Sequence, residues 1–250
     1  MPIFYGIITY MRKITYLFFA VVLFSGCTGT IKKESKEDKI HKIETYYENG
    51  KYQKVLDALK DQISYYIYTK YGDDAEYYLA MSYFHLKDYD DAIPEFEFLI
   101  NTYPNSPYRE KSYYFLALSH YKNSPRIERD QDELKKALQV IRDFETEYPS
   151  SPLKKDFEKL KKDIINKLSL KMIDIIKTYY NLEKYTSSLL YINLLRKEYP
   201  NTEGENLSYL FEGLIRKEEG MDYTDILSKL NTKAIPKRYK KYYKKLLREK

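Results

Sequence analysis

From about residue 40 onward, apolar side chains recur every three or four positions, and no stretch sustains a two-residue alternation. A period of three to four residues places apolar side chains on one face of a helix, whereas strict alternation is typical of half-buried strands. The sequence therefore predicts an all-α protein. Residues 27–39 are polar and nearly free of apolar side chains, so we expect them to form a flexible tether.

A short phrase recurs three times and marks helix boundaries. It reads Tyr103-Pro-Asn-Ser-Pro107, Tyr148-Pro-Ser-Ser-Pro152 and Tyr199-Pro-Asn-Thr202. Proline ends the preceding helix because it lacks an N–H and clashes with the turn before it. Ser106 and Ser151 are the expected N-cap acceptors, with Pro107 and Pro152 at the first helical position.

Residues 72–104 match one tetratricopeptide unit closely. Ala80 on its first helix and Ala92 on its second are small enough for two antiparallel helices to approach each other. Larger side chains fill the space around them, namely Tyr83, Tyr89, Phe96 and Leu99. This unit sets the pattern with which the rest of the chain is compared.

The same pattern returns along the chain with lower fidelity, at residues 40–64, 107–149 and 173–200. Residues 153–171 indicate an extra or lengthened helix, and residues 204–230 a final divergent pair. Such recurrence predicts an α-solenoid of about five tetratricopeptide-like helical hairpins. We divide it into an N-terminal repeat region (40–149), a C-terminal repeat region (150–235) and a basic terminal helix (236–250).

The N-terminus has the parts of an export signal. The basic pair Arg12-Lys13 precedes a short apolar run that ends at Ser25-Gly26, directly before Cys27, the single cysteine of the sequence. The run is too short for a spanning helix, which needs about 20 residues. Because Ser25-Gly26-Cys27 resembles a bacterial lipobox, we predict a lipoprotein signal peptide over residues 1–26 and lipidation of Cys27, with palmitate among the acyl groups.

Two alternatives remain open at this end of the chain. Residues 1–26 could be an ordinary secretory signal, in which case Cys27 would be a buried thiol without a disulfide partner. Met11, followed by Arg12-Lys13, would also make a typical start, so translation could begin at Met1 or at Met11.

Charge is concentrated at the C-terminus. The whole chain has a net charge of +6, and residues 236–250 hold eight Lys or Arg against Glu249 alone. Residues 27–235 are therefore slightly acidic, and nothing in them indicates a nucleic-acid partner. The basic tail is either an adhesive surface for anionic lipid or a solvated helix end with its apolar side chains packed on the last repeat.

The residues that could carry catalysis form no recognisable arrangement. His41, His85 and His120 have no ligand-like spacing to each other or to a cysteine, and the eight glycines form no phosphate-binding cluster. Carboxylates lie at turns and helix starts, where the positive end of a helix favours them. The sequence predicts no enzyme, no metal and no cofactor; a hydrolase that uses His85 or His120 is the weaker rival.

Two longer phrases carry a family resemblance. They are Arg129-Asp-Gln-Asp-Glu-Leu-Lys-Lys-Ala-Leu138 with Tyr148-Pro-Ser-Ser, and Lys167-Leu-Ser-Leu-Lys171 with Tyr199-Pro-Asn-Thr. With the lipobox, the tether and the repeats, they resemble the BamD family, lipoprotein subunits of the outer-membrane β-barrel assembly machinery. Thr28 after the cysteine suits the family's outer-membrane sorting. The segment 67–72 departs from the pattern, since it lacks the Tyr-Pro phrase.

The resemblance implies a lipid-anchored scaffold on the periplasmic face of the outer membrane. In the family, C-terminal repeats hold the periplasmic domain of the barrel subunit, and N-terminal repeats bind unfolded outer-membrane proteins. The side chains that we expect to contact such peptides lie on the first helices of the N-terminal units: Tyr47, Tyr77, Met81, Phe84, Tyr114 and Tyr121. Ordinary core packing is an equal alternative for each of them.

One alternative to this function would have the same lipid anchor and the same repeat fold. Another envelope repeat lipoprotein, acting as an adaptor in cell division or in peptidoglycan-associated complexes, would differ only in the two longer phrases. The sequence does not identify the clients, or the number of companion subunits.

Overall fold

The computed structural model describes residues 35–124 and 132–248. Residues 1–39 and residues 40–250 form two units, and each is considered by itself. The predicted signal peptide, Cys27 and the first part of the predicted tether, residues 27–34, lie outside the described residues.

The described part of the first unit is the start of helix α2 (Lys36–Glu48). The backbone N–H of Asp38 donates to Ser35 Oγ at 3.1 Å, and Asp38 Oδ2 accepts from the N–H of Ser35 at 3.0 Å. This reciprocal pair has the form of a capping box. Helix therefore begins at Lys36, inside the segment expected to be a tether, because Ser35 and Asp38 supply a start signal.

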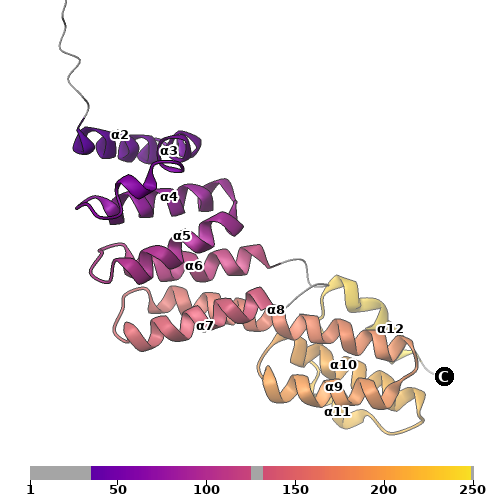
Figure 1. The fold of residues 1–250 in the computed structure, drawn as a ribbon. Helices are drawn as coiled ribbons and strands as arrows, with labels where there is room; N and C mark the ends of the chain where they lie inside the picture. Colours follow the sequence, from indigo (N-terminus) through magenta and orange to yellow (C-terminus); the bar gives the residue numbers. More distant parts are fainter. Residues whose placement is uncertain (1–34, 125–131, 249–250) are drawn as a thin grey trace, which may run out of the picture. The chain divides into compact units, whose positions relative to one another are not determined.

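The second unit confirms the all-α prediction: its described residues form helices and turns, without a strand. From α3 to α11 each helix packs against the next, and contacts also join α4 to α6, α6 to α8, and α8 to α10. These contacts between the first helices of successive pairs are typical of a tetratricopeptide-like solenoid (Figure 1). The helices after α2 are α3 (Tyr52–Leu59), α4 (Gly72–Leu86), α5 (Tyr89–Thr102), α6 (Arg109–Asn123), α7 (Asp132–Glu147), α8 (Lys154–Asn181), α9 (Tyr185–Glu198), α10 (Glu203–Glu218), α11 (Thr224–Lys229) and α12 (Lys240–Leu247).

Helix α8 joins two hydrophobic cores. Phe157 and Ile164 pack into a first core that extends from Ile40 to Leu168, and Ile173 packs into a second that extends from Met172 to Leu246. The extra helix expected over 153–171 and the unit expected from 173 therefore share one continuous helix of 28 residues. The segment contains neither proline nor glycine, so nothing in it interrupts the helix.

One turn geometry recurs after α2, α4, α8 and α10. The central residue of the turn has a positive φ, and its N–H donates to the carbonyl oxygen three residues earlier. The N–H of the following residue donates to the carbonyl oxygen five residues earlier. This is the Schellman arrangement, which satisfies the free carbonyls at a helix C-terminus. The four central residues are Gly50, Lys87, Glu183 and Gly220, with φ between 57° and 72°.

The Tyr-Pro phrases end helices as predicted, but two of them start the next helix later than expected. Helices α6 and α8 begin at Arg109 and Lys154, two residues beyond the predicted prolines. Ser106 Oγ accepts from the N–H of Tyr108 at 3.2 Å, so it closes a turn and does not cap the helix. Ser151 does the same with Leu153 at 2.9 Å. The N-cap prediction for both serines is therefore wrong.

The basic terminal helix is shorter than the range 236–250. A 3₁₀ turn (Lys237–Tyr239) leads into α12, which ends at Leu247. Tyr239, Tyr242 and Leu246 are buried in the second core, so one face of this segment packs on the last repeat.

Candidate peptide-binding surface

Aromatic rings from α2, α4 and the start of α6 contact each other. The ring centroid of Tyr47 lies 5.1 Å from that of Tyr78 and 6.4 Å from that of Tyr77. Tyr77 in turn stacks on Tyr108 at 4.2 Å. These helices are consecutive first helices of repeat units, which is why rings distant in the sequence meet.

A second group of rings continues from α4 to α8. Phe84 lies 5.0 Å from Phe115, whose neighbour Tyr114 lies 5.4 Å from Phe157. Tyr52 stacks on His85 at 4.3 Å and lies 5.8 Å from Tyr47.

His85 also contacts Phe84 at 6.0 Å, so the two groups are connected. We call the resulting set the aromatic strip. It consists of Tyr47, Tyr52, Tyr77, Tyr78, Phe84, His85, Tyr108, Tyr114, Phe115 and Phe157. Six members of the strip were not among the predicted peptide-binding residues, namely Tyr52, Tyr78, His85, Tyr108, Phe115 and Phe157.

Burial separates the six predicted side chains into two sets. Met81 is 3% exposed and Tyr77 is 8% exposed, so both belong to the first core. The other four are half-buried and pack against that core with part of their surface free: Tyr47, Phe84, Tyr114 and Tyr121. The latter set has surface that a partner could contact.

Hydroxyl groups near the strip are occupied within the protein. Tyr78 Oη donates to Glu44 at 3.2 Å, and Tyr108 Oη donates to Asp74 at 2.9 Å. Burial is the main cause that raises the pKa of Tyr108, to about 12. These two hydroxyls stay protonated and already donate to carboxylates within the protein.

Tyr121 lies beside a group of lysines at the α8 side. Lys167 Nζ is 5.1 Å from the Tyr121 ring centroid and also donates to Ser124 Oγ. Burial lowers the pKa of Lys167, and the positive charges of Lys171 and Lys122 lower it further. Tyr121, which lies outside the aromatic strip as defined, therefore borders a positively charged spot that is suited to a carboxylate.

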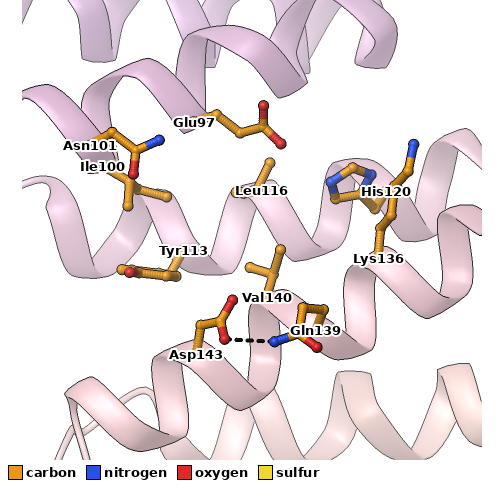
Figure 2. A pocket seen from close by; sticks show the side chains of 10 residues that line it. All are labelled: Glu97, Ile100, Asn101, Tyr113, Leu116, His120, Lys136, Gln139, Val140 and Asp143. Atoms are coloured by element: carbon orange, nitrogen blue, oxygen red, sulfur yellow. Dashed lines mark hydrogen bonds between the residues drawn. The ribbon is translucent and has the colours of Figure 1, made fainter.

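A pocket of about 300 Å³ lies between α5, α6 and α7 (Figure 2). Glu97, Gln139 and Asp143 are among the residues that line it, and Gln139 donates to Asp143 at 2.8 Å. His120 lines the pocket, but its Nδ1 is 2.7 Å from Glu133. None of the ten residues that line this pocket is a serine, threonine or cysteine, so it contains no hydroxyl or thiol of the kind that a serine or cysteine hydrolase uses as nucleophile.

The other two histidines lie apart from this pocket. His41 is exposed beside Glu44, at 3.2 Å, and His85 is part of the aromatic strip. Within residues 35–124 and 132–248, no three His, Cys, Asp or Glu side chains could hold a metal ion. The helices of this same part of the chain are too short or too polar to cross a membrane.

An apolar pair on α9 was not anticipated from the sequence. Leu190 is 66% exposed and Leu194, one turn later, is 37% exposed. The opposite face of α9 packs Ile192 and Leu195 into the second core. The buried side chains of α9 are Ser188, Ile192 and Leu195, so Leu190 and Leu194 lie outside the core.

Stacked helical hairpins of this kind define a helical-repeat protein. The chain belongs to the family described as "YfiO: Outer membrane lipoprotein", whose family model matches residues 33–219. It is also similar to "Outer membrane protein assembly factor BamD" of Caulobacter vibrioides, with 22% identity over 149 residues. That alignment covers 57% of this chain and 48% of the relative, so the chain spans about half the length of the curated protein it matches.

These matches confirm the resemblance to the BamD family. Membership indicates a role in outer-membrane assembly and association with the outer membrane. The family description names an outer-membrane lipoprotein, and the name of the relative is that of an assembly factor.

Proposed function

We propose that this chain is a scaffold subunit of the β-barrel assembly machinery, anchored through a lipid on Cys27 at the periplasmic face of the outer membrane. Its N-terminal repeats bind unfolded outer-membrane proteins, and its C-terminal repeats bind the periplasmic domain of the barrel subunit. The observation that carries the first part is the aromatic strip, in which rings from successive repeats contact each other and several of them, among them Tyr47, Phe84 and Tyr114, are half-buried.

The strip suits an extended peptide. Rings with one face in the core and one face free offer rigid apolar area, and holding them in place costs little conformational entropy. Apolar side chains of an unfolded strand would pack against Tyr47, Phe84 and Tyr114, and a carboxylate of the strand would approach the lysines beside Tyr121. No bond is made or broken in this function.

The C-terminal repeats offer a different surface. Leu190 and Leu194 form an exposed apolar pair on α9, beside half-buried Tyr191, which stacks on Tyr179 at 5.3 Å. Apolar side chains exposed together on one helix face are typical of a protein contact. We assign this face to the barrel subunit.

Affinity capture from detergent-solubilised envelope tests the scaffold role. We expect a barrel protein with repeated periplasmic domains to co-purify, and to be lost with Leu190→Asp and Leu194→Asp together. Recovery of division or peptidoglycan-associated proteins in its place would support the adaptor alternative and refute this proposal.

Peptide binding is tested separately with single alanine variants. Tyr114→Ala and Tyr121→Ala should each weaken binding of a labelled outer-membrane strand peptide about tenfold, because each removes one ring contact. Fluorescence anisotropy gives the Kd. Tyr191→Ala, which removes a half-buried ring that packs on the second core, is the matched control and should leave the Kd unchanged.

Helical content separates binding from folding in this experiment. Circular dichroism should show the same helix signal for all three variants at the temperature of the assay. An unchanged Kd in both Tyr114→Ala and Tyr121→Ala would assign these rings to the core and end the peptide-binding proposal.

A further inference from the structure

Helix α12 is held to the last repeat by one face only. Tyr239 and Leu246 are each 1% exposed in the second core. Lys217 Nζ donates to the carbonyls of Lys245 and Leu246 at 3.0 Å, which satisfies the C-terminal end of the helix. Lys245 donates to Tyr180 Oη at 2.8 Å and pairs with Glu218 at 2.9 Å.

The other face carries basic side chains without acidic partners among the described residues. Lys240, Lys241 and Lys244 are exposed, and none forms an ion pair there. At 3.6 residues per turn they fall within roughly one quarter of the helix circumference. Exposed basic side chains flank this arc on both sides along the chain, namely Lys237, Arg238 and Arg248.

An exposed apolar side chain borders the same arc. Leu247 is 56% exposed and lies three positions after Lys244, so the two share one side of the helix. Half-buried Tyr243 lies between Leu247 and the buried face. A basic face with an apolar side chain at its edge is typical of helices that lie on membrane surfaces.

We propose that this face, defined by Lys240, Lys241, Lys244 and Leu247, adsorbs to the anionic headgroups of a phospholipid membrane. The inference rests on membership in an outer-membrane lipoprotein family, which brings the chain to a membrane, and does not depend on peptide binding. Lysines attract anionic lipid as independent positive charges, and exposed Leu247 favours a lipid interface over an acidic protein. Together with a lipid anchor, a basic surface would give the chain a second point of attachment to the membrane.

Vesicle flotation with the full chain tests this surface. The chain should bind vesicles that contain 30% phosphatidylglycerol, and the variant with Lys240→Glu, Lys241→Glu and Lys244→Glu should bind them at least about tenfold more weakly, since each lysine near the surface contributes roughly fivefold. Added salt should weaken binding of the unaltered chain, because it screens exposed charges. Leu247→Ser should weaken it by a smaller factor.

The matched control reverses three other exposed lysines, at Lys154, Lys155 and Lys159 on α8. Residues 1–34, which include Cys27, are the same in every variant, so any membrane binding through this segment cancels in the comparison. Binding unaffected by the α12 reversal, or reduced equally by the α8 reversal, would overturn the proposal. So would equal binding to pure phosphatidylcholine vesicles, or retention on an acidic protein matrix without retention on lipid.

Discussion

Glu76 is a carboxylic acid placed almost wholly inside the protein, at 1% exposure on α4. Its Oε1 has no hydrogen-bond partner. Burial raises the pKa of Glu76 to about 9, and the nearby carboxylate of Glu95 on α5 adds to this effect. Glu76 therefore keeps its proton at neutral pH, and a protonated carboxyl can donate to Glu95 where a charged one would repel it.

The shift at Glu76 makes stability depend on pH. Because the folded-state pKa lies above the ordinary value of 4.5, the folded protein holds an extra proton between about pH 4.5 and pH 9. Stability should therefore fall as pH rises through this window. Glu76→Gln, which keeps a neutral donor, should reduce the fall and raise the Tm at pH 8.

Thermal unfolding followed by circular dichroism at pH 5 to 9 measures this dependence. Glu97→Gln, at an exposed position of α5, is the control and should follow the unaltered protein. A Glu76→Gln profile parallel to that of the unaltered protein would show that Glu76 is ionised in the fold.

Position 72 requires a glycine because neighbouring atoms lie too close to its Cα to leave room for a side chain. A Cβ at this position would lie 2.5 Å from Tyr103 Oη and 2.8 Å from the carbonyl oxygen of Ile67, which themselves form a hydrogen bond of 3.0 Å. Gly72→Ala should therefore destabilise the protein by about 1–3 kcal/mol. Urea unfolding measures the difference.

A glycine elsewhere serves as the comparison. A Cβ at Gly213 in α10 would meet side-chain methyls, those of Leu246 at 3.4 Å and Cγ2 of Ile226 at 3.7 Å. Gly213→Ala should change the free energy of unfolding by less than about 1 kcal/mol, since alanine also favours helix. Equal effects of the two substitutions would contradict the role of the Tyr103 contact.

At the scale of elements, the recurring Schellman turn shows how the hairpins are built. Gly50 and Gly220 adopt positive φ without strain, whereas Lys87 and Glu183 adopt it with a side chain present. The turn is therefore imposed by the packing of the helices on either side. Only two of the four central positions carry glycine, the residue whose own conformational preference favours a positive φ.

These positions give a paired prediction. Glu183→Gly should stabilise the protein by about 0.5 kcal/mol, because relief of the positive φ exceeds the entropy that glycine adds to the unfolded chain. Gly50→Ala should destabilise it by about 1 kcal/mol, and this cost is purely conformational because no atom lies within 4 Å of the added Cβ. Both values come from urea unfolding; a destabilised Glu183→Gly would mean that its side chain contributes more than its backbone costs.

At the scale of the whole molecule, the two repeat regions are not separable at the predicted boundary. The boundary at 149/150 precedes α8, but the hydrophobic cores meet inside α8, between Leu168 and Met172. Truncation at residue 150 would remove Phe157, Leu160 and Ile164 from the first core. Peptide binding and partner docking are thus proposed for surfaces joined by one continuous helix, and tests of either should use the full chain.

The sequence alone determined the all-α class, the repeat units and the family resemblance, because helical periodicity, Tyr-Pro phrases and motif spacing are local properties. It also indicated candidate rings such as Tyr47 and Tyr114 by their place on first helices. Tertiary structure decided which of them keep free surface: Tyr77 is covered by Tyr108 from the next repeat, and Met81 is buried. Burial, the pKa of Glu76 and the joining of two cores by α8 depend on contacts between distant segments, which exist only once the hairpins have packed.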